Sequence, residues 1–181
     1  MDRKWKKIDS KVLYKDKYGT IVLDKVIRPD GVEDEYWYSK RIDGVIIIAF
    51  DGENIIFVVE HRYPVGENLI ELPMGGIKNG EILKSAKEEL FEETGIIANE
   101  FENIGAFYIS PGYDTVLMNV FVAKNLDIKK IGKDMQENDE AIVDVITKPV
   151  IEVKKMIIEN KIKCGLTLAA LNKFFIYLEI K

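Results

Sequence analysis

The chain has little of what would place a protein outside the cell or in a membrane. Among its 181 residues there is a single cysteine, Cys164, which excludes an intramolecular disulfide and favours a reducing compartment. The longest obvious apolar run spans residues 45–50, well short of the ~20 residues that a membrane helix needs. The N-terminal stretch MDRKWKKIDSKVLYK is too charged for a secretory signal. We therefore expect a cytoplasmic protein without a membrane span.

An excess of basic charge is also missing. The net charge is −5, from 26 basic and 31 acidic residues, which argues against a protein that binds nucleic acid over a broad surface. Residues 1–17 are the exception, with seven Lys or Arg against three Asp, and this arm is either solvated or meets an anionic ligand. Acidic residues gather in two clusters, which are Glu88, Glu89, Glu92 and Glu93, and then Asp134, Glu137, Asp139 and Glu140.

The pattern of apolar residues predicts many short strands and three helices. Alternating apolar residues predict one or two strands within 11–27 and further strands at 36–50, 54–60, 69–72, 104–109, 116–123 and 141–146. Turns are expected at Pro29-Asp30-Gly31 and, as a turn or bulge, at Asp43-Gly44. Helical spacing predicts helices over 82–94, 150–160 and 167–179, the last with Thr167 as its N-cap. The pattern favours an α+β domain at 41–181 after an N-terminal β extension at 1–40.

The predicted helix 82–94 has the strongest chemical signal. Leu83, Ala86, Leu90 and Thr94 share one face and are expected to pack on the core. The four glutamates of the first cluster fall within an arc of about 140° on the opposite side. Two of them lie in the last turn before Gly95, where the helix dipole disfavours each anion by about 0.3–1 kcal/mol. Like-charge pairs four residues apart destabilise the helix further.

A bound divalent cation would remove both penalties, for which the sequence shows no obvious compensating lysine. Clustered carboxylates are ligands that Mg²⁺ or Mn²⁺ prefers, usually with water and substrate phosphates. A solvated acidic helix face is the alternative. The loop before the helix contains Gly75 and Gly76, where the backbone can approach a ligand closely, although an ordinary strand-to-helix connection has the same composition.

The segment 71–96, ELPMGGIKNGEILKSAKEELFEETGI, resembles the Nudix box of the Nudix hydrolases. The positions that match the box in type are Gly75, Glu81, Glu89, Leu90, Glu92, Glu93, Gly95 and Ile96. The spacing after Glu81 is one residue short, and Glu88 stands where the family has an arginine that pairs with the glutamates and orients them. Either the metal-free face is therefore more repulsive, or Lys84 or Lys87 replaces the arginine, or Glu88 itself recruits metal.

Flanking segments resemble the ADP-ribose pyrophosphatase subgroup. His61-Arg62-Tyr63-Pro64 is similar to its Gln-Tyr-Arg segment, Glu71-Leu72-Pro73-Met74-Gly75 to its Glu-x-Pro-Ala-Gly, and Pro111 lies 16 residues after Gly95, as in ADP-ribose hydrolases. The resemblance implies a Nudix fold, which is an α/β/α sandwich with a mixed sheet. The substrate-binding residues that we expect are Arg62, Glu71, Gly75, Gly76, Pro111 and Trp37. For Arg62 a structural salt bridge, and for Trp37 simple packing, are the alternatives.

The resemblance implies metal-dependent hydrolysis of a nucleoside diphosphate linked to another moiety, with ADP-ribose giving AMP and ribose 5-phosphate. Metal ligands would be Glu89, Glu93, the Met74 carbonyl and Glu140, with Mg²⁺ or Mn²⁺ as cofactor. Glu89, Glu92 and Glu93 would be catalytic, and Glu137 or Asp139 would act as the base, unless the acidic loop is merely solvated. The alternatives are a non-catalytic nucleotide sensor with the same fold, and a hydrolase of another nucleotide sugar or dinucleotide. The family also implies a homodimer in which residues 1–40 serve as a dimerisation arm.

Overall fold

A computed structural model describes residues 3–127 and 141–181. The chain divides into two compact units. The first contains the described residues up to Asp43 together with Phe107–Leu117, and the second contains Gly44–Ala106 and Met118–Lys181. Each unit has its own sheet, and the two are described in turn.

The first unit is built on an antiparallel three-stranded sheet in the order β1-β2-β3. Its strands are β1 (Lys6–Lys15), β2 (Thr20–Ile27) and β3 (Glu33–Lys40). The turn predicted at Pro29-Asp30-Gly31 is confirmed, because Gly31 has φ of 89° and donates its N–H to the Arg28 carbonyl at 2.9 Å. Segment 107–117 is attached to β3, where the N–H of Ser39 donates to the Tyr113 carbonyl at 2.8 Å.

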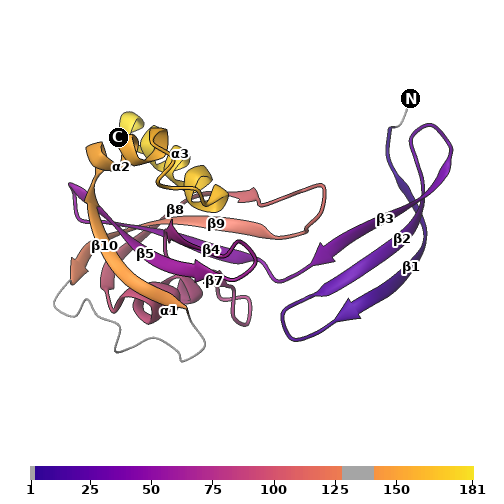
Figure 1. The fold of residues 1–181 in the computed structure, drawn as a ribbon, viewed down its shortest axis with the longest axis horizontal. Coiled ribbons are helices and arrows are strands. Elements are labelled where there is room, and N and C mark those ends of the chain that lie inside the picture. The colour runs from indigo at the N-terminus through magenta and orange to yellow at the C-terminus, as the bar shows by residue number, and fades with distance from the viewer. Residues whose placement is uncertain (1–2, 128–140) are drawn as a thin grey trace. The chain divides into compact units, whose positions relative to one another are not determined.

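The second unit is a seven-stranded mixed sheet with helices on both faces (Figure 1). Its path is β10-β5-β4-β9-β8, while β6 pairs with β5 and β7 pairs with β4. The strands and helices are β4 (Gly44–Phe50), β5 (Asn54–Arg62), β6 (Glu67–Glu71), β7 (Met74–Gly76), α1 (Ile82–Thr94), β8 (Ile97–Tyr108), β9 (Leu117–Asp127), β10 (Ile142–Pro149), α2 (Val150–Ile158) and α3 (Gly165–Ile180). The sheet is mixed because β4 and β9 pair in parallel, while β5 pairs antiparallel with β4, β6 and β10. The expected α/β/α sandwich with a mixed sheet is confirmed.

The core of the second unit forms on both faces of β4. Val45 and Ile47 pack with Ala86 and Leu90 of α1 in one buried cluster. Phe50 meets Phe174 of α3 edge-to-face, with 5.1 Å between the ring centroids. Because α1 covers one face of the sheet and α2 and α3 cover the other, β4 is apolar and buried along nearly its whole length (Figure 1). Helix α1 is thereby fixed over β4 and β7.

The structure departs from the predicted elements at two places that sequence periodicity does not resolve. The predicted strand 36–50 was expected to contain a turn or bulge at Asp43-Gly44, but it is interrupted over residues 41–43, and its halves, β3 and β4, belong to different sheets. Thr167 was expected to cap α3, but α3 begins at Gly165 with Cys164 as the N-cap. No helix within the described residues is long and apolar enough to cross a membrane.

Candidate functional site

Helix α1 buries a face that is partly acidic. Glu89 and Glu93 are only 7% and 6% exposed, and they lie on the buried side of the helix with Ala86 and Leu90. Leu83 was expected in the core but is 46% exposed. The predicted apolar inner face is confirmed for Ala86, Leu90 and Thr94, and the prediction is wrong for Leu83 and for the outward position of Glu89 and Glu93. It fails because β7, which lies against this helix, presents glycines that leave room for carboxylates.

Glu89 and Glu93 converge on the backbone of β7. A Cβ atom added at Gly75 would lie 2.2 Å from the Glu89 carboxylate, so no residue with a side chain fits there without displacing Glu89. The N–H of Met74 donates to Glu93 Oε2 at 3.2 Å. Since the N–H and C=O of one strand residue leave the strand on the same side, the Met74 carbonyl is directed to the side of β7 where Glu93 lies.

The turn that ends α1 has the geometry that its sequence predicts. Gly95 has φ of 72°, a left-handed conformation, and its N–H donates to the Phe91 carbonyl at 2.8 Å. Thr94 Oγ1 accepts the N–H of Ile96 at 3.1 Å. These contacts fix the last turn of the helix, and with it the backbone that carries Glu92 and Glu93.

A lysine compensates the acidic helix face, contrary to the interpretation of the sequence. Lys78 Nζ lies 3.0 Å from Glu92 Oε2 and 3.8 Å from Glu89 Oε1. Burial alone would lower the pKa of Lys78, but the hydrogen bond to Glu92 and the charges of the nearby glutamates raise it above its ordinary value. Lys84 instead pairs with Glu81 at 2.9 Å, and Lys87 lies over the Phe101 ring. The two lysines considered as replacements for the arginine thus have other partners.

Arg62 and Glu71 form a second charged group of the second unit. Arg62 donates Nε and an NH2 group to the Glu71 carboxylate, the shorter bond being 2.6 Å, and also pairs with Glu60 at 2.8 Å. Glu71 is 2% exposed, so the bidentate pair satisfies an otherwise buried charge. Burial raises the pKa of Glu60, against the opposing effect of Arg62. This geometry fits the structural salt bridge that the sequence left open, while the Arg62 side chain keeps 36% exposure.

The other expected substrate contacts lie in different surroundings. Gly76 is in β7 and pairs with Gly44 of β4. Trp37 and Pro111 belong to the first unit, where Trp37 is 52% exposed and packs on Tyr113 with 5.5 Å between ring centroids. Pro111 is exposed in the loop that precedes Asp114. Glu137, Asp139 and Glu140 lie outside the described residues.

The donor set of α1 and β7 fits a hard divalent cation. Two buried carboxylates and a backbone carbonyl are oxygen donors of the kind that Mg²⁺ and Mn²⁺ prefer. Within residues 3–127 and 141–181 no three Asp, Glu, His or Cys side chains form a metal-binding group. A cation held by Glu89 and Glu93 would therefore need backbone, water or substrate oxygens to complete its shell, which is usual for Mg²⁺.

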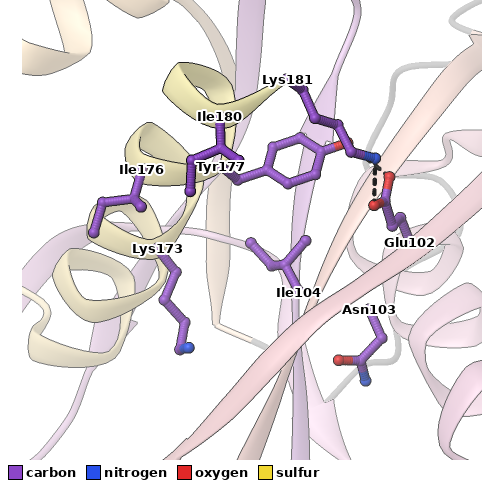
Figure 2. A pocket seen from close by; sticks show the side chains of 8 residues that line it. All are labelled: Glu102, Asn103, Ile104, Lys173, Ile176, Tyr177, Ile180 and Lys181. Carbon is purple, nitrogen blue, oxygen red and sulfur yellow. Dashed lines mark hydrogen bonds and ion pairs between the residues drawn. The ribbon is translucent and has the colours of Figure 1, made fainter.

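A separate cavity of about 360 Å³ lies between β8 and α3 (Figure 2). Figure 2 shows Ile104 and Tyr177 in its wall, and Lys181 bound to Glu102 at its rim. Tyr177 donates to Glu102 Oε2 at 2.7 Å. Because α1 and α3 cover opposite faces of the sheet, this cavity is not part of the carboxylate site (Figure 1).

Comparison with known proteins identifies the family. The NUDIX domain pattern matches residues 40–159, which include α1 and its carboxylates. The chain belongs to the Nudix family. In addition, the nucleoside diphosphate sugar hydrolase N-terminal domain pattern matches residues 5–38.

Similar proteins include several named hydrolases. The chain is 27% identical over 178 residues to the ADP-ribose pyrophosphatase of Bacillus subtilis (strain 168), covering 97% of this chain and 93% of that protein. It is 27% identical over 139 residues to the GDP-mannose pyrophosphatase of Yersinia enterocolitica, with 72% of each covered. A crystal structure of an ADP compounds hydrolase superposes with a TM-score of 0.83 at 19% identity, covering 97% and 95% of the two chains. The protein is thus a Nudix hydrolase related to ADP-ribose pyrophosphatases.

Three residues organise this Nudix domain and the first unit in ways that sequence reasoning did not predict: Lys78 and Asp114 were missed, and Thr167 was expected only as a helix cap. Lys78 donates to Glu92 of α1 at 3.0 Å, Thr167 Oγ1 accepts the Leu72 N–H at 3.0 Å, and Asp114 accepts the Ser39 hydroxyl at 2.5 Å. Lys78 stands in the loop directly before the helix, so its charge was visible in the sequence but its direction was not. Thr167 and Asp114 act on residues that are 95 and 75 positions away in the chain, which local periodicity does not reveal.

Proposed function

We propose that this Nudix hydrolase cleaves ADP-ribose to AMP and ribose 5-phosphate with Mg²⁺ as cofactor and Mn²⁺ as a substitute. The observation that supports it most directly is the burial of Glu89 and Glu93 against β7, where Gly75 leaves room for the Glu89 carboxylate and the Met74 N–H binds Glu93. The relatedness to an ADP-ribose pyrophosphatase over 97% of the chain favours this substrate. The GDP-mannose pyrophosphatase match covers 72% of the chain, which makes a nucleotide sugar the second candidate.

Each residue of the proposed site has a task. Glu89, Glu93 and the Met74 carbonyl would hold the metal, with Glu140 as a further ligand. A bound divalent cation neutralises the diphosphate and lowers the pKa of a water molecule. Glu92 would complete the acidic face, and Glu137 or Asp139 would orient and deprotonate the attacking water. Such a reaction depends on positioning and charge stabilisation, which a domain with one histidine and one cysteine can provide.

Several residues are proposed to bind the substrate. Arg62, with part of its guanidinium exposed, would contact a phosphate or the ribose, and Glu71 would hold Arg62 in place. Gly75 and Gly76 would let the backbone approach the diphosphate. Trp37 and Pro111, which belong to the first unit, stay predictions as substrate contacts, Trp37 by stacking on the adenine.

A substrate panel tests the proposal. The purified protein is incubated with Mg²⁺ and separately with ADP-ribose, GDP-mannose, another nucleotide sugar and a dinucleotide, and the products are separated by ion-exchange chromatography. We expect AMP and ribose 5-phosphate from ADP-ribose at the highest kcat/KM, and no product in EDTA. A higher kcat/KM for GDP-mannose would replace the substrate assignment. Binding of ADP-ribose without cleavage of any of these compounds would support the non-catalytic sensor instead. That alternative is considered because Glu88 stands where the family has an arginine.

The proposal includes a cytoplasmic homodimer formed through residues 1–40. All ten residues of β1 are exposed, and they include Ile8, Val12, Leu13 and Tyr14. A partner copy covering this strand would remove apolar surface from water. The lone cysteine agrees with a reducing compartment.

A further inference from the structure

The ion pairs around Lys78 have a consequence for metal binding. Lys78 Nζ lies 3.0 Å and 3.3 Å from the two oxygens of Glu92, and 3.8 Å from Glu89 Oε1. Glu88 also contributes to the field at this ammonium. One positive charge therefore stands among three carboxylates of α1. The last turn of α1 itself contains no basic residue, so this charge comes from outside the helix.

The backbone of Lys78 is fixed to the start of the same helix. Its N–H donates to Ser85 Oγ at 2.9 Å, and its carbonyl accepts the N–H of Glu81 at 3.0 Å. Ser85 is fully buried and donates in turn to the Glu81 carbonyl at 3.0 Å. Because both backbone groups are bound, the Lys78 side chain begins from a defined place at the edge of the acidic face.

We propose that Lys78 is a built-in counter-ion of the metal-binding carboxylates, and that it sets how much divalent cation the site requires. This inference rests on the proposed function, because it takes Glu89 as a metal ligand. In the metal-free protein the ammonium reduces the repulsion among Glu88, Glu89 and Glu92. When a divalent cation binds Glu89, the same ammonium repels it and shares that carboxylate with it.

A matched set of variants tests this counter-ion. Lys78→Gln removes the charge and keeps a side chain of similar length, while Lys78→Arg keeps the charge. Lys84→Gln is the control for net charge. It also removes one positive charge, but Lys84 pairs with Glu81 at 2.9 Å and not with Glu89 or Glu92. The probe is Mn²⁺ alone, and its free concentration is read by electron paramagnetic resonance on the full chain without substrate.

We expect Lys78→Gln to bind Mn²⁺ about 2- to 5-fold more tightly than the wild type, which is the effect of an exposed ion pair. Lys78→Arg and Lys84→Gln should stay near the wild type. In EDTA, Lys78→Gln should unfold at a lower temperature than the wild type, and Mn²⁺ should raise its unfolding temperature by more. In EDTA, the double variant Lys78→Gln and Glu88→Gln should unfold near the wild-type temperature, because it removes one negative charge together with the positive charge.

Other results would overturn the inference. Weaker Mn²⁺ binding by Lys78→Gln would mean that Lys78 orients the carboxylates for the metal rather than competing with it. If the wild type binds Mn²⁺ and Lys78→Gln binds it with the same affinity, the inference about Lys78 is wrong, while the proposed function is unaffected. If Lys84→Gln gains as much Mn²⁺ affinity as Lys78→Gln, the effect comes from net charge and not from the position of Lys78. A wild type that takes up no Mn²⁺ would overturn the proposed metal site and this inference together.

Discussion

Two residues at the contact of α1 and β7 determine the shape of the acidic site. Gly75 leaves the space that the Glu89 carboxylate fills, and Met74 donates its N–H to Glu93. Carboxylates at 6–7% exposure are costly unless they are hydrogen-bonded or paired. The site is therefore held by close packing as well as by charge, and single substitutions at these positions should separate the two contributions.

Glu93→Gln is expected to abolish metal-dependent hydrolysis while the protein stays folded. The amide oxygen can still accept the Met74 N–H, and the last turn of α1 loses one unfavourable negative charge, so stability should stay equal or rise slightly. Hydrolysis of ADP-ribose at saturating Mg²⁺ and thermal unfolding in EDTA are the two measurements. Turnover equal to that of the wild type would remove Glu93 from the metal ligands.

Gly75→Ala is expected to displace the Glu89 carboxylate and to destabilise the fold by about 1–3 kcal/mol, the range for overpacking in a tight site. The added Cβ would lie 2.2 Å from that carboxylate. Gly165→Ala is the control, because a Cβ at this first position of α3 meets nothing within 4 Å. Urea unfolding of both variants gives the comparison. An unchanged midpoint for Gly75→Ala would show that Glu89 moves away at no cost.

At the scale of elements, two long-range hydrogen bonds fix loops beside the sheets. Thr167, in the first turn of α3, accepts the N–H of Leu72 at 3.0 Å in a fully buried position. The next residues are Pro73 and Met74, so this bond anchors the entrance to β7. In the first unit, Asp114 binds Ser39 on β3 and Arg41 beyond it. Each bond joins elements that lie far apart in the sequence.

Thr167→Val should lower the free energy of unfolding by about 1–3 kcal/mol, because it leaves the buried Leu72 N–H without an acceptor. Thr167→Ser keeps the hydroxyl and should cost less. Chemical denaturation of both variants measures the difference. If the two variants lose the same amount, the methyl group of Thr167 matters and its hydroxyl does not.

Asp114 makes the first unit sensitive to acid. Burial alone would raise the pKa of this carboxyl, but the Ser39 hydroxyl, the Val116 N–H and Arg41 lower it below its ordinary value of 3.8. A lowered pKa stabilises the fold at pH values above about 4, and this contribution is lost as the pH falls through the pKa of the folded state.

Asp114→Asn is therefore expected to be about 1–3 kcal/mol less stable at pH 7, the range for a hydrogen-bonded charge, and closer to wild type at pH 3. Unfolding free energies measured across this pH range give the result. Parallel pH profiles of the variant and the wild type would contradict the role given to Asp114.

At the scale of the whole molecule, the proposed homodimer depends on the exposed strand β1. Val12→Glu places a charge on this strand, where the wild-type side chain is 57% exposed, and should shift the protein from dimer to monomer. Ile158→Glu, at an 82% exposed position that ends α2, is the control and should leave the mass unchanged. Sedimentation velocity measures both. A wild type that sediments as a monomer at all concentrations would end the dimer proposal.

The sequence by itself determined which segment carries the chemistry. The bounds of α1, the left-handed Gly95 and the turn at residues 29–31 are local properties or follow from apolar periodicity, and all were predicted. The sandwich class was implied by the resemblance of the box to a known family. Clustered glutamates before Gly95 also indicated the family, because the spacing of the box lies within one loop and one helix.

Tertiary structure alone decided which of those glutamates are buried and which cation faces them. Periodicity placed all four on the outer side of the helix, but Glu89 is buried in the space beside Gly75, Glu93 is buried beside Met74, and Leu83 is exposed. Likewise, Lys78 meets Glu92 only because the loop turns back over the helix. A sequence records the charges and the apolar stripe of a helix, while the shape of the strand packed against it decides which side chains can be buried.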